Sequence, residues 1–320
     1  MQRIYTCTMN PAIDLFIATK QLQMNTVNRT LHDDIQANGK GVNVSLVLKM
    51  LGIENTAFGF SAGFTGKYIE DFLKKKGVDN QFIHVDGKTR INVFAQVLED
   101  DCEYKLVNKG PFIPKNAIET LLEQIRQLNK GDFLCISGSL PKGVSEEILL
   151  EISKITHEKG VHLLLDSSSP IILDCLPYQP FLLKPNEEEL AHWFGEEMIS
   201  FEEYPFYLEQ LLSCGAENIL LSLGEKGGVY ANPKQMLYAN APKGEVVNTA
   251  CAGDTLLATF LKGIVCQENL AETLKTAIAA GSSTSFSQGL TDFHDVEKLK
   301  QQVTVRDFSV LQKEKSEWGV

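Results

Sequence analysis

The chain has 320 residues, of which 43% are hydrophobic and 22% are charged, and its formal net charge is −11. This size and composition predict one large folded domain, alone or with a small subdomain, and argue against disorder. The negative charge argues against a nucleic-acid partner and against an anionic membrane, so a phosphorylated ligand would need a few local cations.

The first part of the chain alternates strands and helices, with two exceptions. Apolar patterns predict strands at residues 4–8, 56–60 and 81–85, and helices at 42–51 and 66–76. The segments at about 12–37 and 88–108 do not fit this alternation. The second of them contains two extended stretches around Asp100-Asp101, a pair typical of a hairpin turn. We expect both segments to form a small β-sheet lid on the main domain.

The later part of the chain alternates more regularly. It predicts strands at 133–137, 162–166, 182–183 and 218–222, a hairpin at 228–240, and helices at 115–128, 145–158, 187–193, 204–213, 253–266 and 270–286. This order indicates an α/β fold with a mostly parallel sheet covered by helices on both faces. We expect a single domain over residues 1–303 and a peripheral tail over residues 304–320.

The stretch from Asn248 to Thr255 places small residues and a carboxylate, Asp254, directly before an apolar helical pattern. A turn of small residues at a helix start directs free backbone N–H groups at one point, where an anion can bind. Asp254 either caps the helix or accepts a proton from a nucleophile that attacks a phosphate. This stretch alone leaves the two interpretations equal.

Polar and small residues follow five predicted strands. They are Asn10-Pro11-Ala12-Ile13-Asp14, Ser137-Gly138-Ser139-Leu140-Pro141, Asp166-Ser167-Ser168, Lys184-Pro185-Asn186 with Glu189, and Ser222 to Gly227. The carboxyl ends of parallel strands meet at one edge of a sheet, so these residues predict a ligand site there. Neither a Walker A loop nor a G-x-G-x-x-G turn is present, which argues against those nucleotide-binding classes.

Five motifs occur in the order typical of one enzyme family. They are Asn38-Gly39-Lys40-Gly41-x-Asn43, Ser137 to Pro141, Lys184-Pro185-Asn186-x-x-Glu189, Ser222-Leu223-Gly224-x-x-Gly227 and Ala252-Gly253-Asp254-Thr255. Over about residues 4–300 the sequence therefore resembles the ribokinase-like sugar kinases of the phosphofructokinase B family. Asn10-Pro11-Ala12-x-Asp14 and Thr89-Arg90-Ile91-Asn92-Val93 resemble the branch of bacterial 1-phosphofructokinases and tagatose-6-phosphate kinases, and the second motif is closer to the former.

The resemblance implies a ribokinase-like three-layer fold and an ATP- and Mg²⁺-dependent transfer of phosphate to a ketose phosphate. Fructose 1-phosphate, giving fructose 1,6-bisphosphate, is the first expectation, and tagatose 6-phosphate is the alternative within the same chemistry. A non-catalytic sugar-phosphate sensor on a kinase fold is an alternative of another class. A homodimer through the lid is a further expectation.

The resemblance also implies a role for each motif residue. Asp254 would be the catalytic base, and the amides of Cys251, Ala252 and Gly253 would stabilise charge on the transferred phosphoryl group. The expected sugar-phosphate ligands are Asp14, Gly39, Lys40, Asn43, Arg90, Asn92 and Ser139. The expected nucleotide ligands are Lys184, Asn186, Ser222, Gly224, Gly227, Gly253, Gly281 and Ser285. Glu189 would hold Mg²⁺, largely through water.

Plainer interpretations exist for several of these residues. Lys184 and Arg90 could be ordinary surface cations, Glu189 suits any helix start, and small residues at 281 and 285 equally suit helix packing. Arg29 and Lys109 are weaker candidates for binding the sugar phosphate, and we expect both to be exposed.

Two positions depart from the family pattern. Asn38 and Cys251 each stand where glycine is usual; asparagine tolerates a left-handed backbone, whereas cysteine there would be strained.

The seven cysteines form no Cys-x-x-Cys pair and predict neither a disulfide framework nor a zinc site. No signal-peptide pattern and no apolar run of membrane length occur in the sequence. A reducing cytoplasmic location is therefore expected.

Overall fold

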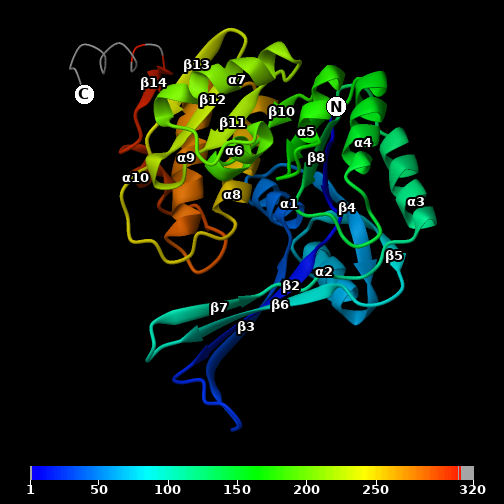
Figure 1. The fold of residues 1–320 in the computed structure, drawn as a ribbon, viewed down its shortest axis with the longest axis vertical. Coiled ribbons are helices and arrows are strands. Elements are labelled where there is room, and N and C mark those ends of the chain that lie inside the picture. The colour runs from blue at the N-terminus through cyan, green and yellow to red at the C-terminus, as the bar shows by residue number, and fades with distance from the viewer. Residues whose placement is uncertain (1, 309, 311–320) are drawn as a thin grey trace.

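The computed structural model describes residues 2–308 and 310 (Figure 1). Within these residues the larger sheet contains, in spatial order, β14 (Val305–Asp307), β13 (Gln235–Ala239), β12 (Gly228–Asn232), β11 (Ile219–Ser222), β10 (Leu182–Leu183), β9 (His162–Asp166), β8 (Phe133–Ser137), β1 (Ile4–Thr8), β4 (Asn55–Ala62) and β5 (Asp79–Val85). The strands from β11 to β5 pair in parallel, and β12, β13 and β14 add an antiparallel edge.

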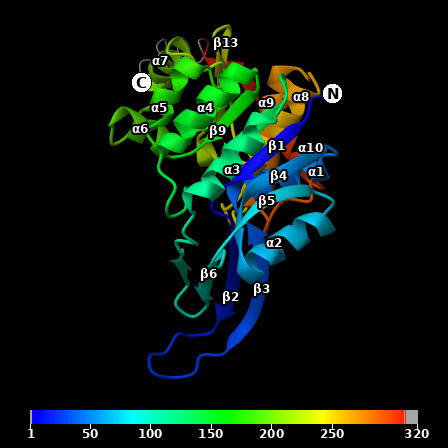
Figure 2. The same cartoon turned by 90° about the vertical axis from the view of Figure 1, so that its right-hand side faces the viewer.

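Helices cover both faces of this sheet, as Figure 2 shows from the side. One layer contains α3 (Lys115–Arg126), α4 (Glu147–Lys159), α5 (Ile172–Cys175), α6 (Glu187–Phe194) and α7 (Tyr204–Ser213). The other contains α1 (Lys40–Met50), α2 (Gly63–Lys75), α8 (Ala252–Val265), α9 (Leu270–Ser285) and α10 (Val296–Lys300). Short 3₁₀ turns occur at Leu176–Tyr178, Phe201–Glu203 and Gly224–Lys226.

The strand β8 shows why the central strands are apolar throughout. All five of its residues are buried. Leu134 and Ile136 pack into the core beneath α3 and α4, whereas Phe133 and Cys135 pack into the core beneath α1, α8 and α9. Because successive side chains of a strand point to opposite faces, a sheet covered on both sides has no polar face in its centre.

The lid sheet consists of β3 (Thr30–Asn38), β2 (Ala12–Thr19), β6 (Arg90–Val97) and β7 (Cys102–Leu106), in that order. It projects from one end of the main domain (Figure 1). β2 pairs with β6 in parallel, although the two strands are far apart in sequence, and the β2–β3 and β6–β7 pairs are antiparallel. The base of the lid sheet packs against α2, where Ile13 and Ala37 share a core with Ile69 and Leu73.

The two faces of the lid sheet differ in chemistry. Asp14 is paired in register with Asn92 and Gln36, and these side chains lie on one face. The next row on the opposite face is apolar and runs across all four strands in register; it consists of Ile35, Leu15, Val93 and Leu106. Ile35 and Leu106 are 49% and 59% exposed, so this apolar row is open to solvent.

The fold predicted from the sequence, an α/β sheet with helices on both faces and a small β-sheet lid, is confirmed. Within the stretch expected to be a peripheral tail, β14 joins the larger sheet and Phe308 is buried against Phe201, with ring centroids 4.9 Å apart. The rest of that expected tail, residues 309 and 311–320, lies outside the described part of the chain, apart from Val310. None of the helices in the described residues has the length and apolar character of a membrane span.

Candidate active site

The start of α8 is a turn with an unusual backbone. Its N-cap, Cys251, has φ 64° and ψ −4°, the left-handed conformation. This conformation costs a non-glycine residue about 1 kcal/mol. The strain foreseen for cysteine at this position is therefore present. A Cβ atom added to Gly253 would lie 3.3 Å from Lys184 Nζ, so the first turn of α8 faces an ammonium group and can hold an anion between them.

Asp254 is the buried carboxylate of this turn, with 5% of its surface exposed. Its Oδ2 accepts a hydrogen bond of 2.8 Å from Asn43 Nδ2, at the start of α1. Burial, reinforced by the nearby carboxylate of Asp166, raises the pKa of Asp254 to about 7. A carboxylate that titrates near neutrality is suited to accepting a proton. A capping role alone does not explain its hydrogen bond to another helix.

Asp166, at the carboxyl end of β9, lies between two lysines and is fully buried. Its Oδ1 is 3.0 Å from Lys40 Nζ and 3.4 Å from Lys184 Nζ. Burial alone would raise the pKa of Asp166, but the two ammonium groups outweigh it and hold the pKa below its usual range. Lys184 is only 5% exposed, which rules out a simple surface role. The cluster therefore holds two ammonium groups around one carboxylate beside the start of α8.

Glu189 adds a second carboxylate to this cluster. Its Oε1 lies 3.7 Å from Lys40 Nζ. Its Oε2 accepts from the backbone N–H of Asn186 at 3.0 Å, while Asn186 Oδ1 accepts from the Glu189 N–H at 2.7 Å. This capping box fixes the start of α6, so the helix-start interpretation of Glu189 holds alongside its position in the charged cluster.

Asp14, an expected sugar ligand, lies at the base of the lid sheet. It accepts hydrogen bonds from Asn92 Nδ2, at 2.8 Å, and from Asn38 Nδ2. Asn38 Oδ1 in turn accepts from Asn43 Nδ2 at 2.7 Å. Because Asn43 also donates to Asp254, a continuous hydrogen-bonded path joins Asp14 to Asp254. Burial raises the pKa of Asp14, although its two amide donors oppose this shift.

Asn38 and Cys251, the two departures from the family pattern, lie next to each other. Asn38 Nδ2 is 4.0 Å from Cys251 Sγ, and Asn43 Nδ2 is 3.2 Å from the same sulfur. Asn38 does not adopt a left-handed backbone; the positive φ, 139°, belongs to Gly39. Gly39 has no room for a side chain, because a Cβ would lie 2.7 Å from Thr8 Cγ2.

Arg90 lies at the start of β6, two residues from Asn92. Its Nη2 donates to the Asn10 carbonyl at 2.8 Å and lies 3.5 Å from Ser139 Oγ, and its Nη1 donates to the Asn108 carbonyl at 3.3 Å. Burial lowers the pKa of Arg90, against the attraction of Asp14. Arg90 is thus a fixed cation beside the sugar-facing residues, not a freely solvated one.

Three of the expected nucleotide residues, Ser222, Gly281 and Gly227, make contacts with other elements of the fold. Ser222 Oγ donates to the Pro185 carbonyl at 3.3 Å, which places it beside Asn186. Gly281 on α9 approaches the start of α8, since an added Cβ would lie 3.2 Å from the Ala252 carbonyl oxygen. Gly227 packs against β13, where a Cβ would lie 1.9 Å from the Ala239 carbonyl oxygen.

The remaining two residues of this set have local roles in the structure. Gly224 begins the 3₁₀ turn after β11 and has a positive φ of 55°. Ser285 Oγ donates to the Gly281 carbonyl at 3.3 Å, within α9. These contacts account for small residues at both positions, and nothing in them links either residue to Asp254.

Sequence reasoning did not assign roles to Asp166, to the Asn38 side chain or to Asn10. Asp166 was placed at the predicted site edge, because it ends a buried strand as the other motifs do, but its contacts with both lysines were not predicted. The other two depend on tertiary contacts: Asn38 meets Asp14 through the pairing of β2 with β3, and Asn10 Nδ2 meets Ser139 Oγ at 3.3 Å.

Comparison with known proteins finds sugar-phosphate kinases that match nearly the whole chain. The D-tagatose-1-phosphate kinase of Bacillus licheniformis is 46% identical over 94% of this chain and 99% of its own length. The 1-phosphofructokinase of Bacillus subtilis is 34% identical over 94% of this chain and 99% of its own. The crystal structure of Escherichia coli phosphofructokinase-2 with fructose-6-phosphate has a TM-score of 0.85, at 25% identity over 94% and 99% of the two chains.

The sequence profile described as pfkB family carbohydrate kinase matches residues 7–296, which include every site residue described above. The fold, the order of the motifs and the near full-length relatives agree with this match. The chain belongs to the pfkB family of carbohydrate kinases.

Proposed function

We propose that this protein is an ATP-dependent kinase that phosphorylates the 6-hydroxyl group of a ketose 1-phosphate. The observation that carries the proposal is the hydrogen-bonded path from Asp254, at the start of α8, to Asp14 on the lid. This path supports a site in which Asp254 accepts a proton and Asp14 binds sugar hydroxyls. The names of the B. licheniformis and B. subtilis relatives support the substrate class.

Two ketose 1-phosphates fit this proposal, and they differ only in configuration at carbon 4. Fructose 1-phosphate is the expectation from the motif around Arg90. Tagatose 1-phosphate is favoured by the relative with 46% identity. Tagatose 6-phosphate has less support, because the names of both relatives used here place the phosphate on carbon 1.

The proposed reaction uses the chain's own groups as follows. Asp14 and Asn92 orient the sugar by hydrogen bonds to its hydroxyls. Asp254 takes the proton of the acceptor hydroxyl as its oxygen attacks the γ-phosphorus of ATP, and ADP leaves. The N–H groups at the start of α8, together with Lys184, stabilise the charge on the transferred phosphoryl group. Closure of the lid sheet keeps water from the phosphoryl group.

The carboxylates near Lys40 fit a Mg²⁺ ion held largely through water. Asp166 Oδ2 is buried without a hydrogen-bond partner in the described residues, and Glu189 offers a second carboxylate. Oxygen ligands that leave most waters in place are what Mg²⁺ prefers. When bound with ATP, the ion would neutralise phosphate charge. No group of three or more His, Cys, Asp or Glu side chains among residues 2–308 and 310 could hold a metal directly.

The exposed apolar row of the lid sheet supports a homodimer. The row consists of the half-buried Leu15 and Val93 between the exposed Ile35 and Leu106. Two copies of this row can pack face to face around a two-fold axis. A tetrameric form is named for E. coli phosphofructokinase-2, so assembly occurs in a structural relative.

Steady-state assays with both ketose 1-phosphates and with tagatose 6-phosphate test the function. We expect ATP turnover that depends on a ketose 1-phosphate, with a kcat that Asp254→Asn lowers by a factor of about 10² to 10⁴ because the general base is lost. Asparagine at this position keeps the shape of the side chain and an oxygen that can accept the hydrogen bond from Asn43. Turnover that survives Asp254→Asn would show that another group accepts the proton. Binding without any turnover would favour the sugar-phosphate sensor.

A further inference from the structure

An open cavity of about 490 Å³ beside Arg90 is lined by four cationic residues. They are Lys88, Arg90, Lys109 and Lys142, and the remaining lining residues, Ile91, Val107, Asn108 and Gly110, are uncharged. The cavity therefore has four positive and no negative side chains in its wall, within a chain of net charge −11. Such a one-signed wall attracts anions and concentrates them locally.

These cations form no ion pair with a carboxylate in the described residues, although Arg90 feels the more distant attraction of Asp14. None of the four is within salt-bridge distance of a carboxylate in the described part of the chain, whereas Lys40 and Lys184 both contact Asp166. Arg90 Nε is enclosed and has no hydrogen-bond acceptor among the described residues. Like charges held together without partners repel one another, so the arrangement is more stable when an anion binds between them.

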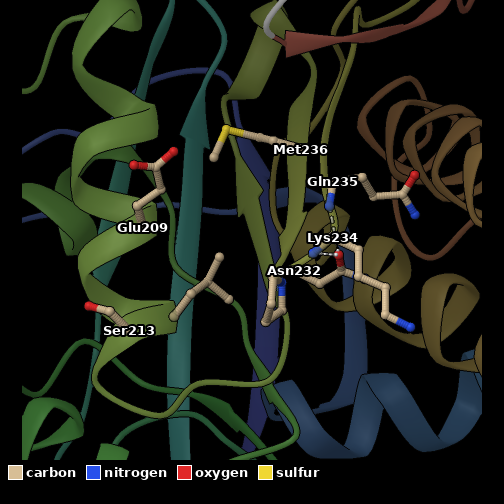
Figure 3. A pocket seen from close by; sticks show the side chains of 8 residues that line it. Glu209, Ser213, Asn232, Lys234, Gln235 and Met236 are labelled. Atoms are coloured by element: carbon tan, nitrogen blue, oxygen red, sulfur yellow. Dashed lines mark hydrogen bonds between the residues drawn. The ribbon is translucent and has the colours of Figure 1, made fainter.

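A second cavity differs in charge from the cationic one. It has a similar volume, about 460 Å³, and lies between α7 and the β12–β13 hairpin (Figure 3). Its wall carries one acid, Glu209, and one base, Lys234, on opposite sides. The excess of positive charge beside Arg90 is thus not shared by this second cavity.

The cationic cavity is continuous with the sugar-facing residues. Arg90 contacts Ser139 and lies two positions from Asn92, which donates to Asp14. The Nη1 of Arg90 also binds the Asn108 carbonyl, and this bond holds the segment that carries Lys109. A sugar seated over Asp14 therefore has one end near Asp254 and can direct its other end towards the cavity.

We propose that Lys88, Lys109 and Lys142 extend the Arg90 site into an anchor for the phosphate of the ketose phosphate, and that they determine the preference for phosphorylated over free ketoses. This inference rests on the proposed function. The recognised chemistry is a phosphate monoester dianion, which exposed ammonium groups bind as point charges. The source is the substrate's own phosphate, not a separate phosphate effector.

The test replaces Lys88, Lys109 and Lys142 by methionine, singly and together, with Lys234→Met as the matched control in the neutral cavity. We expect KM for the ketose 1-phosphate to rise about threefold for each single change and at least ~10-fold for the triple variant. The selectivity for the phosphorylated over the free ketose should fall by the same factor, and KCl should depress kcat/KM less steeply than in the wild type. KM for ATP should not change.

Inorganic phosphate distinguishes the two sources of the anion. Competitive inhibition against the ketose phosphate that weakens in the triple variant supports the anchor. Inhibition or activation that is not competitive would instead assign the cavity to an effector and overturn the inference, as would a triple variant with wild-type KM and salt dependence.

The proposed function can fail separately. If the wild type uses no ketose 1-phosphate, calorimetry with inorganic phosphate still measures the cavity. If inorganic phosphate binds the wild type but not the triple variant, the cavity is an anion site. If it binds both proteins equally, the cavity is not an anion site. Thermal unfolding of each variant shows whether the chain remains folded.

Discussion

At the scale of single residues, Asp254 gives the site a titration near neutral pH. Because its pKa is raised to about 7 by burial and by Asp166, only the enzyme above this pH has the base ready. We expect kcat/KM for the ketose phosphate, which reports the free enzyme, to rise as pH increases through about 7. The raised pKa also favours the protonated folded state, so the stability that Asp254 contributes at low pH is lost as pH approaches 7.

The substrate phosphate also titrates in this range, so a variant must separate the two. Asp166→Asn removes the negative charge that reinforces the raised pKa of Asp254. The rising limb of the kcat/KM profile should therefore move to lower pH in this variant if Asp254 causes it. A limb caused by titration of the substrate phosphate would stay at the same pH. An unmoved limb would assign the titration to the substrate.

Cys251 should be a slow thiol despite its place in the site. Burial, followed by the nearby Asp254 and Asp14, raises its pKa far above the usual range, so little thiolate exists at pH 7.5. Labelling with iodoacetamide, followed by mass spectrometry, should modify the exposed Cys214 and Cys266 first and Cys251 at least ~100-fold more slowly. Rapid loss of activity that follows Cys251 labelling, and that Cys251→Ser abolishes, would contradict this.

At the scale of elements, the lid sheet carries the proposed dimer contact. Ile35→Lys or Leu106→Lys places a charge in the exposed apolar row and should shift the protein to monomers in sedimentation equilibrium. Asp34→Lys is the matched control, because Asp34 lies on the opposite face of β3 and is already polar and exposed. Dimers that persist equally in all three variants would place the contact elsewhere.

The elements also show what the sequence could and could not reveal. The covered strands such as β8 were predictable because both of their faces are buried, which leaves a continuous apolar run. The segment of β3 was predicted to belong to the lid sheet, but the bounds of the strand were not predictable, because six of its nine positions are exposed and no period of burial appears. The parallel pairing of β2 with β6 joins segments more than seventy residues apart in the chain, and no local pattern encodes it. The contact between Asp14 and Asn92 follows from that pairing. The sequence motifs named both residues as sugar ligands, but no sequence pattern predicted that they touch.

At the scale of the whole molecule, the proposed ligand would contact both the lid, through Asp14 and Asn92, and the main domain, through Asp254. A ketose 1-phosphate at 100 times its dissociation constant should raise the free energy of unfolding by about 2.7 kcal/mol. Arg90→Met should lose most of this gain at the same ligand concentration, since it weakens binding, whereas Lys234→Met should keep it. Urea unfolding with and without ligand gives both values. An equal gain in the Arg90→Met variant would show that the guanidinium group of Arg90 does not contribute to ligand binding.

The lid is a single sheet, and its two faces are proposed to serve different partners. In β2, Asp14 lies on the face of the proposed sugar site and its neighbour Leu15 lies in the apolar row, so a single peptide unit separates the proposed sugar site from the proposed dimer contact. Any shift of β2 on assembly therefore moves both. If the proposed dimer changes the affinity for the sugar, thermodynamic reciprocity requires that sugar binding change the stability of the dimer by the same factor. The apparent affinity for the sugar would then depend on protein concentration, and dilute and concentrated solutions of the chain would give different titration curves.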